Sequence, residues 1–78
     1  MNKTEYDIIC QDTISRGGDW TMLYNSEKGA MYSSVMKYTY KRQQFYARAI
    51  YHIFNLKGNR LTSTRNFWDA YNYFKNLA

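Results

Sequence analysis

The chain has no proline, only one cysteine and, from Lys28 through Trp68, no acidic residue. A single cysteine excludes an internal disulfide, so we expect a reducing compartment, with the cytoplasm as the default. No uncharged stretch approaches the roughly 20 apolar residues that a helix needs to cross a bilayer, so we expect no membrane partner. There is also no low-complexity run, and with 45% apolar residues the chain does not read as a disordered tail.

Side chains suited to catalysis and metal binding are scarce as well. One histidine and one cysteine cannot supply the four nitrogen or sulfur ligands of the usual zinc site, and no CxxC motif is present. Cys10 falls on the apolar face of a predicted helix, where we expect a small core residue. His52 falls on the polar side of another predicted helix, where we expect a solvated side chain. The sequence therefore predicts no enzyme, no cofactor and no metal.

Length and aromatic content favour one small folded unit. The 78 residues suffice for a single compact domain, residues 1–78, which buries only about 60% of its unfolded surface. Nine tyrosines, four phenylalanines and two tryptophans compensate, because each buries roughly 150–250 Å². Tyrosine and tryptophan also carry a polar group, so the same residue types can serve a core and an interface.

The start of the chain predicts a helix over residues 4–16. Thr4 and Asp7 have the spacing of a capping box, and Gly17-Gly18 is typical of a left-handed helix end. The face that this helix would bury consists of Tyr6, Ile9, Cys10 and Thr13. A strand through residues 6–10 is the alternative.

A hairpin is expected next. Residues 19–24 alternate between apolar and polar, and residues 25–29 have the composition of a turn. The return strand would occupy residues 31–40, where β-branched and aromatic residues are common. A helix over residues 32–39 fits the same positions and stays open as an alternative.

Beyond Lys41 the apolar spacing becomes typical of a helix. Six residues follow the i, i+4 spacing: Phe45, Tyr46, Ala49, Ile50, Ile53 and Phe54. Gly58 would end this helix, and Ser63 or Thr64 would cap a last one. The predicted fold class is therefore α+β: a small single domain with a helix, a β-hairpin and then an antiparallel helix pair. An all-α bundle is the alternative if residues 30–40 are helical.

The acid-free run is strongly basic. It contains eight cations: Lys28, Lys37, Lys41, Arg42, Arg48, Lys57, Arg60 and Arg65. They account for the formal net charge of +5, because residues 1–27 are slightly acidic. A surface of one sign attracts molecules of the opposite sign, and interleaved tyrosines can stack or fill pockets. We expect the partner-binding face to contain Lys37, Tyr40, Lys41, Arg42, Tyr46, Arg48, Tyr51, Lys57, Arg60 and Arg65.

These features predict a small non-enzymatic binding protein. In size and composition the chain resembles many small proteins of phages and mobile elements, among them inhibitors of host defence such as anti-CRISPR proteins; the likeness carries no residues across. It implies an inhibitor that blocks a larger host protein or nucleoprotein complex in the host cytoplasm. The alternative is a direct DNA- or RNA-binding protein or small transcriptional regulator, because arginine and tyrosine are enriched in both kinds of interface. We expect a monomer or a small homo-oligomer.

Overall fold

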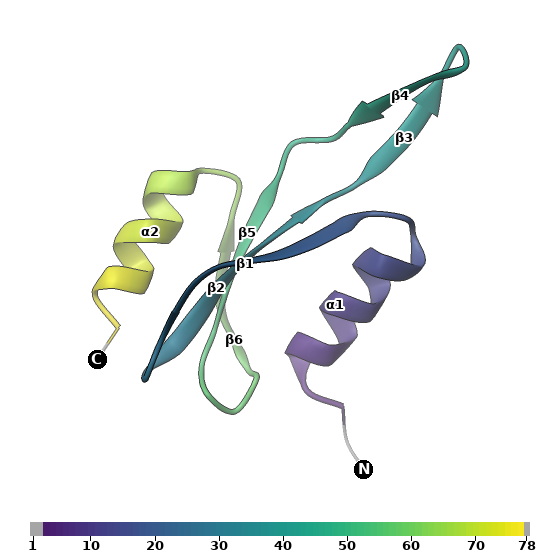
Figure 1. Cartoon of the computed structure of the whole chain (residues 1–78). Coiled ribbons are helices and arrows are strands. Elements are labelled where there is room, and N and C mark those ends of the chain that lie inside the picture. The colour runs from purple at the N-terminus through teal and green to yellow at the C-terminus, as the bar shows by residue number, and fades with distance from the viewer. Residues whose placement is uncertain (1–2, 78) are drawn as a thin grey trace.

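The computed structural model describes residues 3–77, and within that range most of the regular structure is strand (Figure 1). The elements are α1 (Glu5–Ser15), β1 (Asp19–Ser26), β2 (Gly29–Val35), β3 (Lys37–Tyr40), β4 (Gln43–Tyr46), β5 (Ile50–Phe54), β6 (Arg60–Thr64) and α2 (Phe67–Lys75). Four strands form an antiparallel sheet in the order β1-β2-β5-β6, while β3 and β4 form a separate two-stranded sheet.

The helix predicted at the start of the chain is confirmed as α1. Thr4 is its N-cap: the backbone N–H of Asp7 donates to the Thr4 hydroxyl at 3.2 Å, and the Thr4 N–H donates to the Asp7 carboxylate at 3.4 Å. Gly17 adopts a φ of +79°, the left-handed conformation that ends the helix. The predicted inner face is also confirmed, because Thr13 is buried while Tyr6, Ile9 and Cys10 are half-buried.

The first hairpin is confirmed, but its predicted return strand over residues 31–40 is too long, because β2 ends at Val35 and β3 belongs to the other sheet. Strands β1 and β2 pair from Asp19 opposite Val35 to Ser26 opposite Gly29, so the turn falls within the predicted residues 25–29. A bulge between Met22 and Tyr24 shifts the register within β1. The alternative of a helix over residues 32–39 is wrong, since β2 and β3 occupy that stretch.

The helix predicted beyond Lys41 is wrong, because β4 and β5 occupy it. The i, i+4 spacing combined residues of two strands. Phe45 and Tyr46 lie in the exposed strand β4, whereas Ile50, Ile53 and Phe54 lie in β5, a strand that is covered on both faces. Such a strand carries apolar residues without alternation, and a short apolar run of this kind cannot be distinguished from a buried helix by spacing alone. Gly58 does adopt a left-handed φ of +83°, but it turns the chain from β5 into β6 instead of ending a helix.

The predicted fold class is wrong for the same reason. The α+β arrangement with an antiparallel helix pair is absent from residues 3–77, and so is the all-α bundle. Only the second helix of that pair exists. It begins at Phe67, later than predicted, because Ser63 and Thr64 extend β6 and Asn66 is the N-cap, accepting from the Asp69 N–H at 3.1 Å.

The two helices cover opposite faces of the four-stranded sheet (Figure 1). Under α2, the side chains of Met31, Ile53 and Ala70 are fully buried. Under α1 lies a cluster of aromatic rings formed by Tyr6, Trp20, Tyr32, His52 and Phe54. Since neighbouring residues of β5 point to opposite faces, Ile53 serves the first core and Phe54 the second.

The two-stranded sheet projects from this body. Strand β2 continues through Met36 into β3, and β4 returns through residues 47–49 into β5, so β3 and β4 extend one long hairpin beyond the helices (Figure 1). At its root, the Ala47 N–H donates to the Met36 carbonyl at 2.8 Å. We call residues 37–46 the arm. The arm explains why the radius of gyration is 13.4 Å, since a compact chain of this length has about 11.5 Å.

Candidate functional site

The arm exposes four large aromatic side chains. The exposed fractions are 53% for Tyr38, 60% for Tyr40, 38% for Phe45 and 62% for Tyr46. Because these side chains stay exposed and do not pack on the buried cluster under α2, they contribute little to the hydrophobic stability of the body. Surface aromatics of this kind are typical anchors of binding sites.

Cross-strand pairing divides these side chains between the two faces of the arm. Tyr38 lies opposite Phe45, and their rings stack with centroids 5.6 Å apart and planes inclined by 23°. Tyr40 is on the same face, since it lies two residues beyond Tyr38. Tyr46 lies on the other face opposite Lys37, whose Nζ is 5.7 Å from the Tyr46 ring centroid. Both faces therefore present aromatic surface.

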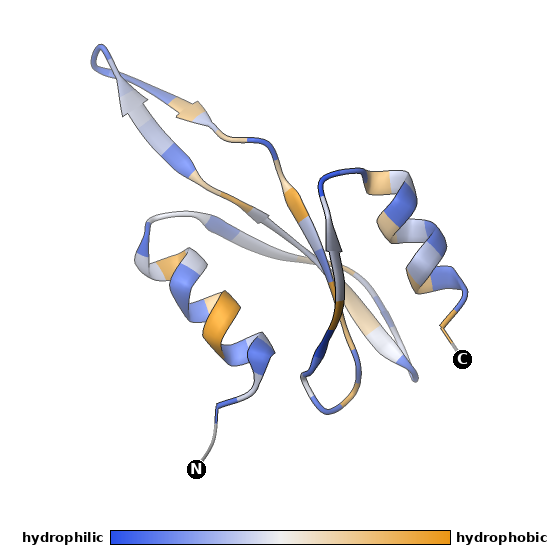
Figure 2. Ribbon diagram, turned by 180° about the vertical axis from the view of Figure 1, so that it is seen from behind, coloured by the Kyte–Doolittle hydropathy of each residue, from blue (hydrophilic) through white to orange (hydrophobic). Residues whose placement is uncertain are grey.

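The tip of the arm carries positive charge that has no carboxylate partner among residues 3–77, although the Lys41 Nζ lies 5.3 Å from the Tyr40 ring centroid. Lys41 and Arg42 are exposed there, and Figure 2 colours the tip as hydrophilic. Lys37 at the root does have a carboxylate partner, with its Nζ 3.4 Å from Asp19. Within residues 3–77 no carboxylate lies within ion-pair distance of Lys41, Arg42 or Arg48. An incoming anion therefore meets these charges without having to displace a protein carboxylate.

The turn at the tip has an unusual sequence for its backbone. Lys41 and Arg42 both adopt left-handed conformations, with φ of 51° and 64°. A two-residue hairpin turn with both central residues at positive φ favours Asn-Gly, because a Cβ in this conformation costs about 1–2 kcal/mol per residue. Residues held in such conformations concentrate at functional sites. Asparagine and glycine would adopt this turn at a lower energetic cost. The presence of lysine and arginine in their place indicates that the charge has a function.

The left-handed conformations at the tip lead to a prediction about the free energy of unfolding. The double substitution Lys41→Asn and Arg42→Gly should raise the free energy of unfolding by about 1 kcal/mol, since relief of the left-handed strain outweighs the entropy that glycine loses on folding. Thermal denaturation should show a midpoint higher by roughly 4–8 °C. Lys41→Ala with Arg42→Ala is the matched control, because it removes the same charges and keeps both Cβ atoms. An equal rise in that control would assign the gain to charge instead of backbone conformation.

The structure brings part of the predicted partner-binding face together. The arm holds Lys37, Tyr40, Lys41, Arg42 and Tyr46, and the segment that joins it to β5 holds Arg48. Arg65 follows β6 at the arm end of the sheet, because Thr64 pairs with Tyr51 near the start of β5. These residues form one basic and aromatic end of the molecule.

The remaining predicted residues lie elsewhere. Lys57 and Arg60 flank the turn between β5 and β6, at the end of the sheet opposite the arm. Arg60 contacts α1, with its Nε 3.9 Å from the Glu5 carboxylate. Tyr51 is half-buried under α2, where its ring meets that of Phe67 edge-on at 5.5 Å. The sequence analysis had assigned these side chains and those of the arm to one partner-binding face, and the strand topology separates them.

His52 is buried in the sheet, not solvated as predicted. Its Nε2 is 2.9 Å from the Ser34 hydroxyl, and its Nδ1 is 2.9 Å from the Ser63 hydroxyl. Burial, followed by the positive charge of Arg60, lowers the pKa of His52 to about 4, so the ring is neutral near pH 7. A serine–histidine contact of this length resembles a nucleophile with its base. Ser34 and His52 are only 6% and 5% exposed, and we interpret the three side chains as a polar link across β2, β5 and β6.

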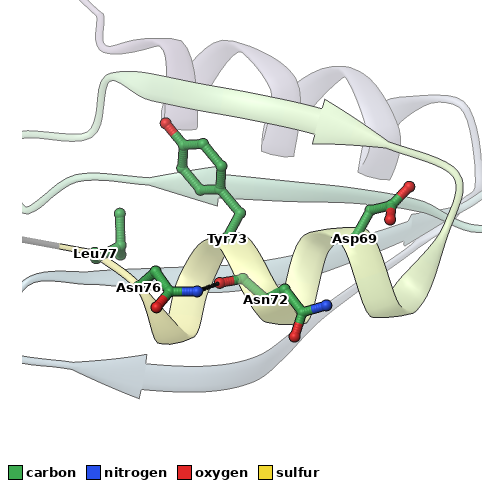
Figure 3. Close-up of a pocket in the computed structure, with 5 residues that line it drawn as sticks. All are labelled: Asp69, Asn72, Tyr73, Asn76 and Leu77. Atoms are coloured by element: carbon green, nitrogen blue, oxygen red, sulfur yellow. Dashed lines mark hydrogen bonds between the residues drawn. The ribbon is translucent and has the colours of Figure 1, made fainter.

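Several surface depressions lie away from the arm, and some of them touch a helix. One, on the outer side of α2, is lined by Asp69, Asn72, Tyr73, Asn76 and Leu77 (Figure 3). Its side chains spread along the helix instead of converging, and the Asn76 amide donates to the Asn72 carbonyl at 2.7 Å. Another, of about 300 Å³, is lined by residues that include Tyr6, Tyr32 and Phe54. Burial, followed by the neighbouring Tyr6, raises the pKa of Tyr32 to about 12, so the Tyr32 phenol stays neutral near pH 7.

Comparisons of the chain with protein-family models, curated proteins and solved structures found no match. Among residues 3–77, no three His, Cys, Asp or Glu side chains gather in a way that would hold a metal ion. Neither described helix is long and apolar enough to cross a membrane. The inference of function therefore rests on the arm.

Proposed function

We propose that the protein is a non-enzymatic binding protein that inserts its arm into a larger host protein or nucleoprotein complex and blocks it. The observation that carries this proposal is the arm itself, which projects from the body (Figure 1) and exposes aromatic side chains beside two tip cations, Lys41 and Arg42, that have no carboxylate partner within residues 3–77. The two hydrophobic cores of the body are buried without the arm or its exposed side chains. A ribbon of this kind inhibits by occupancy, since a groove that it fills is closed to the groove's own ligand.

Pre-organisation supports the same proposal. The arm is an extension of β2 and β5, which are the two inner strands of the sheet, so the body fixes its direction. Stacking of Tyr38 on Phe45 further restrains the strands. A partner that binds an ordered ribbon avoids most of the entropic cost of ordering a loop. The free thiol of Cys10 suits a reducing compartment, and we propose the host cytoplasm as the place of action.

Removal of the arm tests the proposal. Residues 37–46 can be replaced by Asn-Gly, because Met36 and Ala47 already hydrogen-bond across the root at 2.8 Å and a two-residue turn can close there. The armless protein should keep its circular dichroism spectrum and a thermal midpoint close to that of the full chain. It should no longer retain the complex that the immobilised full chain captures from host lysate.

A second variant keeps the arm and removes only its anchors. Tyr40→Ser with Tyr46→Ser changes the two most exposed arm tyrosines, which should cost little folding stability. If they are hot spots, each should weaken capture by about 2 kcal/mol or more. Undiminished capture by both the armless and the tyrosine variant would place the binding surface elsewhere and overturn the proposal.

A further inference from the structure

Resting on the proposed function, we infer that the arm binds the major groove of duplex DNA, either free or within the nucleoprotein complex. Sequence composition alone left protein and nucleic acid undecided. The shape of the arm, its polar side chains and the cations around its root all favour DNA.

The dimensions of the arm match the groove. Strands β3 and β4 contain four residues each, so at about 3.4 Å per residue the arm is roughly 14 Å long. The major groove of B-form DNA is about 12 Å wide and 8.5 Å deep, and it admits a two-stranded ribbon. Because the arm is longer than the groove is deep, its tip reaches the base edges while the body stays outside the phosphate backbones.

The polar side chains of the arm have the right chemistry for DNA. Beside the tip cations, Thr39, Gln43 and Gln44 are exposed, with Thr39 opposite Gln44. Glutamine amides pair with adenine edges, arginine pairs with guanine, and the threonine methyl group packs on thymine. Lys41 at the tip suits DNA better than a protein partner, because lysine is depleted from protein interfaces and commonly contacts phosphates.

Cations at the root of the arm are placed to meet phosphates. Arg48 follows the arm directly, and Arg65 lies at the same end of the sheet through the pairing of Thr64 with Tyr51. Both side chains are exposed and, within residues 3–77, neither lies within ion-pair distance of a carboxylate. With the tip inside the groove, these two arginines face the backbones that border it, which is where positioning contacts are made.

Binding to a 20-bp DNA duplex of mixed sequence, followed by fluorescence anisotropy, tests the inference. The full chain should bind in the micromolar range at physiological salt, with an affinity that falls by a log–log slope near −0.9 for each phosphate contacted. Lys41→Asn with Arg42→Gly should weaken binding roughly tenfold or more, although the same variant is expected to be more stable.

The matched control removes two cations from the other end of the molecule. Lys28→Gln with Lys75→Gln lowers the formal net charge of +5 by the same amount, and both residues line a shallow depression at the end opposite the arm. This control should bind DNA nearly as well as the full chain. Equal losses in the tip variant and the control would show attraction by net charge alone and overturn the inference.

Two further probes separate the groove from other partners. A 20-bp RNA duplex should bind much more weakly, because its major groove is too narrow for side chains to enter. Equal or tighter binding to that duplex, or to single-stranded DNA, would contradict groove insertion. If the full chain binds no duplex DNA yet captures a nuclease-treated complex through its arm, the DNA inference fails while the proposed inhibitory function stands.

Discussion

Replacing Phe54 by alanine should lower the free energy of unfolding by about 3–5 kcal/mol. Its side chain is 2% exposed and sits in the middle of the aromatic cluster under α1. Ring centroids lie at 5.3 Å to Tyr6, 5.8 Å to Tyr32 and 6.1 Å to Trp20. Alanine would leave a cavity that these rigid rings cannot close, and α1 would lose the main surface that holds it to the sheet.

The size of this effect is large for so small a protein. A chain of 78 residues has a total stability of about 4–12 kcal/mol, so Phe54→Ala should remove between about a quarter and all of it. Urea denaturation followed by tryptophan fluorescence measures the loss. Phe54→Leu is the control, because it keeps most of the buried volume and should cost much less. A midpoint unchanged by alanine would mean that α1 does not pack on the sheet through this ring.

Acidification should destabilise the protein through His52. Its pKa is about 4 in the folded protein against 6.5 for an unperturbed histidine, so between these values the unfolded chain binds a proton that the folded chain does not. Stability should be constant with respect to this group above pH 6.5, fall as the pH drops from 6.5 to 4, and level off below 4. At 1.36 kcal/mol per unit, the loss amounts to about 3 kcal/mol.

Carboxylates also titrate at the lower end of this range, so the measurement needs a variant without the histidine. His52→Gln keeps a hydrogen-bond donor and an acceptor between Ser34 and Ser63 but does not ionise. Urea denaturation of both proteins at intervals from pH 7.5 to 4 gives the contribution of His52 as the difference between their slopes. Parallel curves would mean that the ring is hydrated and free to take up its proton.

The parts of the fold that sequence reasoning predicted are those with local signals. The capping box of Thr4 and Asp7, and the turn between β1 and β2, depend on residues close together in the chain. Strand β5 has no such signal, because helices cover both its faces and its apolar residues do not alternate. Its composition was informative, since Ile50–Phe54 contains two isoleucines, a tyrosine and a phenylalanine, which are strand formers.

The sequence predicted the basic and aromatic residue types of the candidate site, but not that they lie on a projecting hairpin. The acid-free run placed Lys41 and Arg42 in the predicted partner-binding face, but their turn lacks the Asn-Gly signature by which a hairpin is recognised. Without that turn, the arm was assigned partly to a helix, and Tyr51 was grouped with the exposed tyrosines. The polar link through His52 was missed because the partners Ser34 and Ser63 come from strands that are distant in the sequence.

The free edges of the arm have a consequence for solubility. Strands β3 and β4 pair only with each other, so each leaves one edge of backbone N–H and carbonyl groups without a strand partner. Exposed edges flanked by aromatic side chains tend to pair with other copies and aggregate, and natural proteins counter this with charged side chains, lysine above all. The cations of the arm therefore repel the arm of a second copy as well as attract an anion. A substitution that stabilises the turn by removing these cations also removes this protection against self-association.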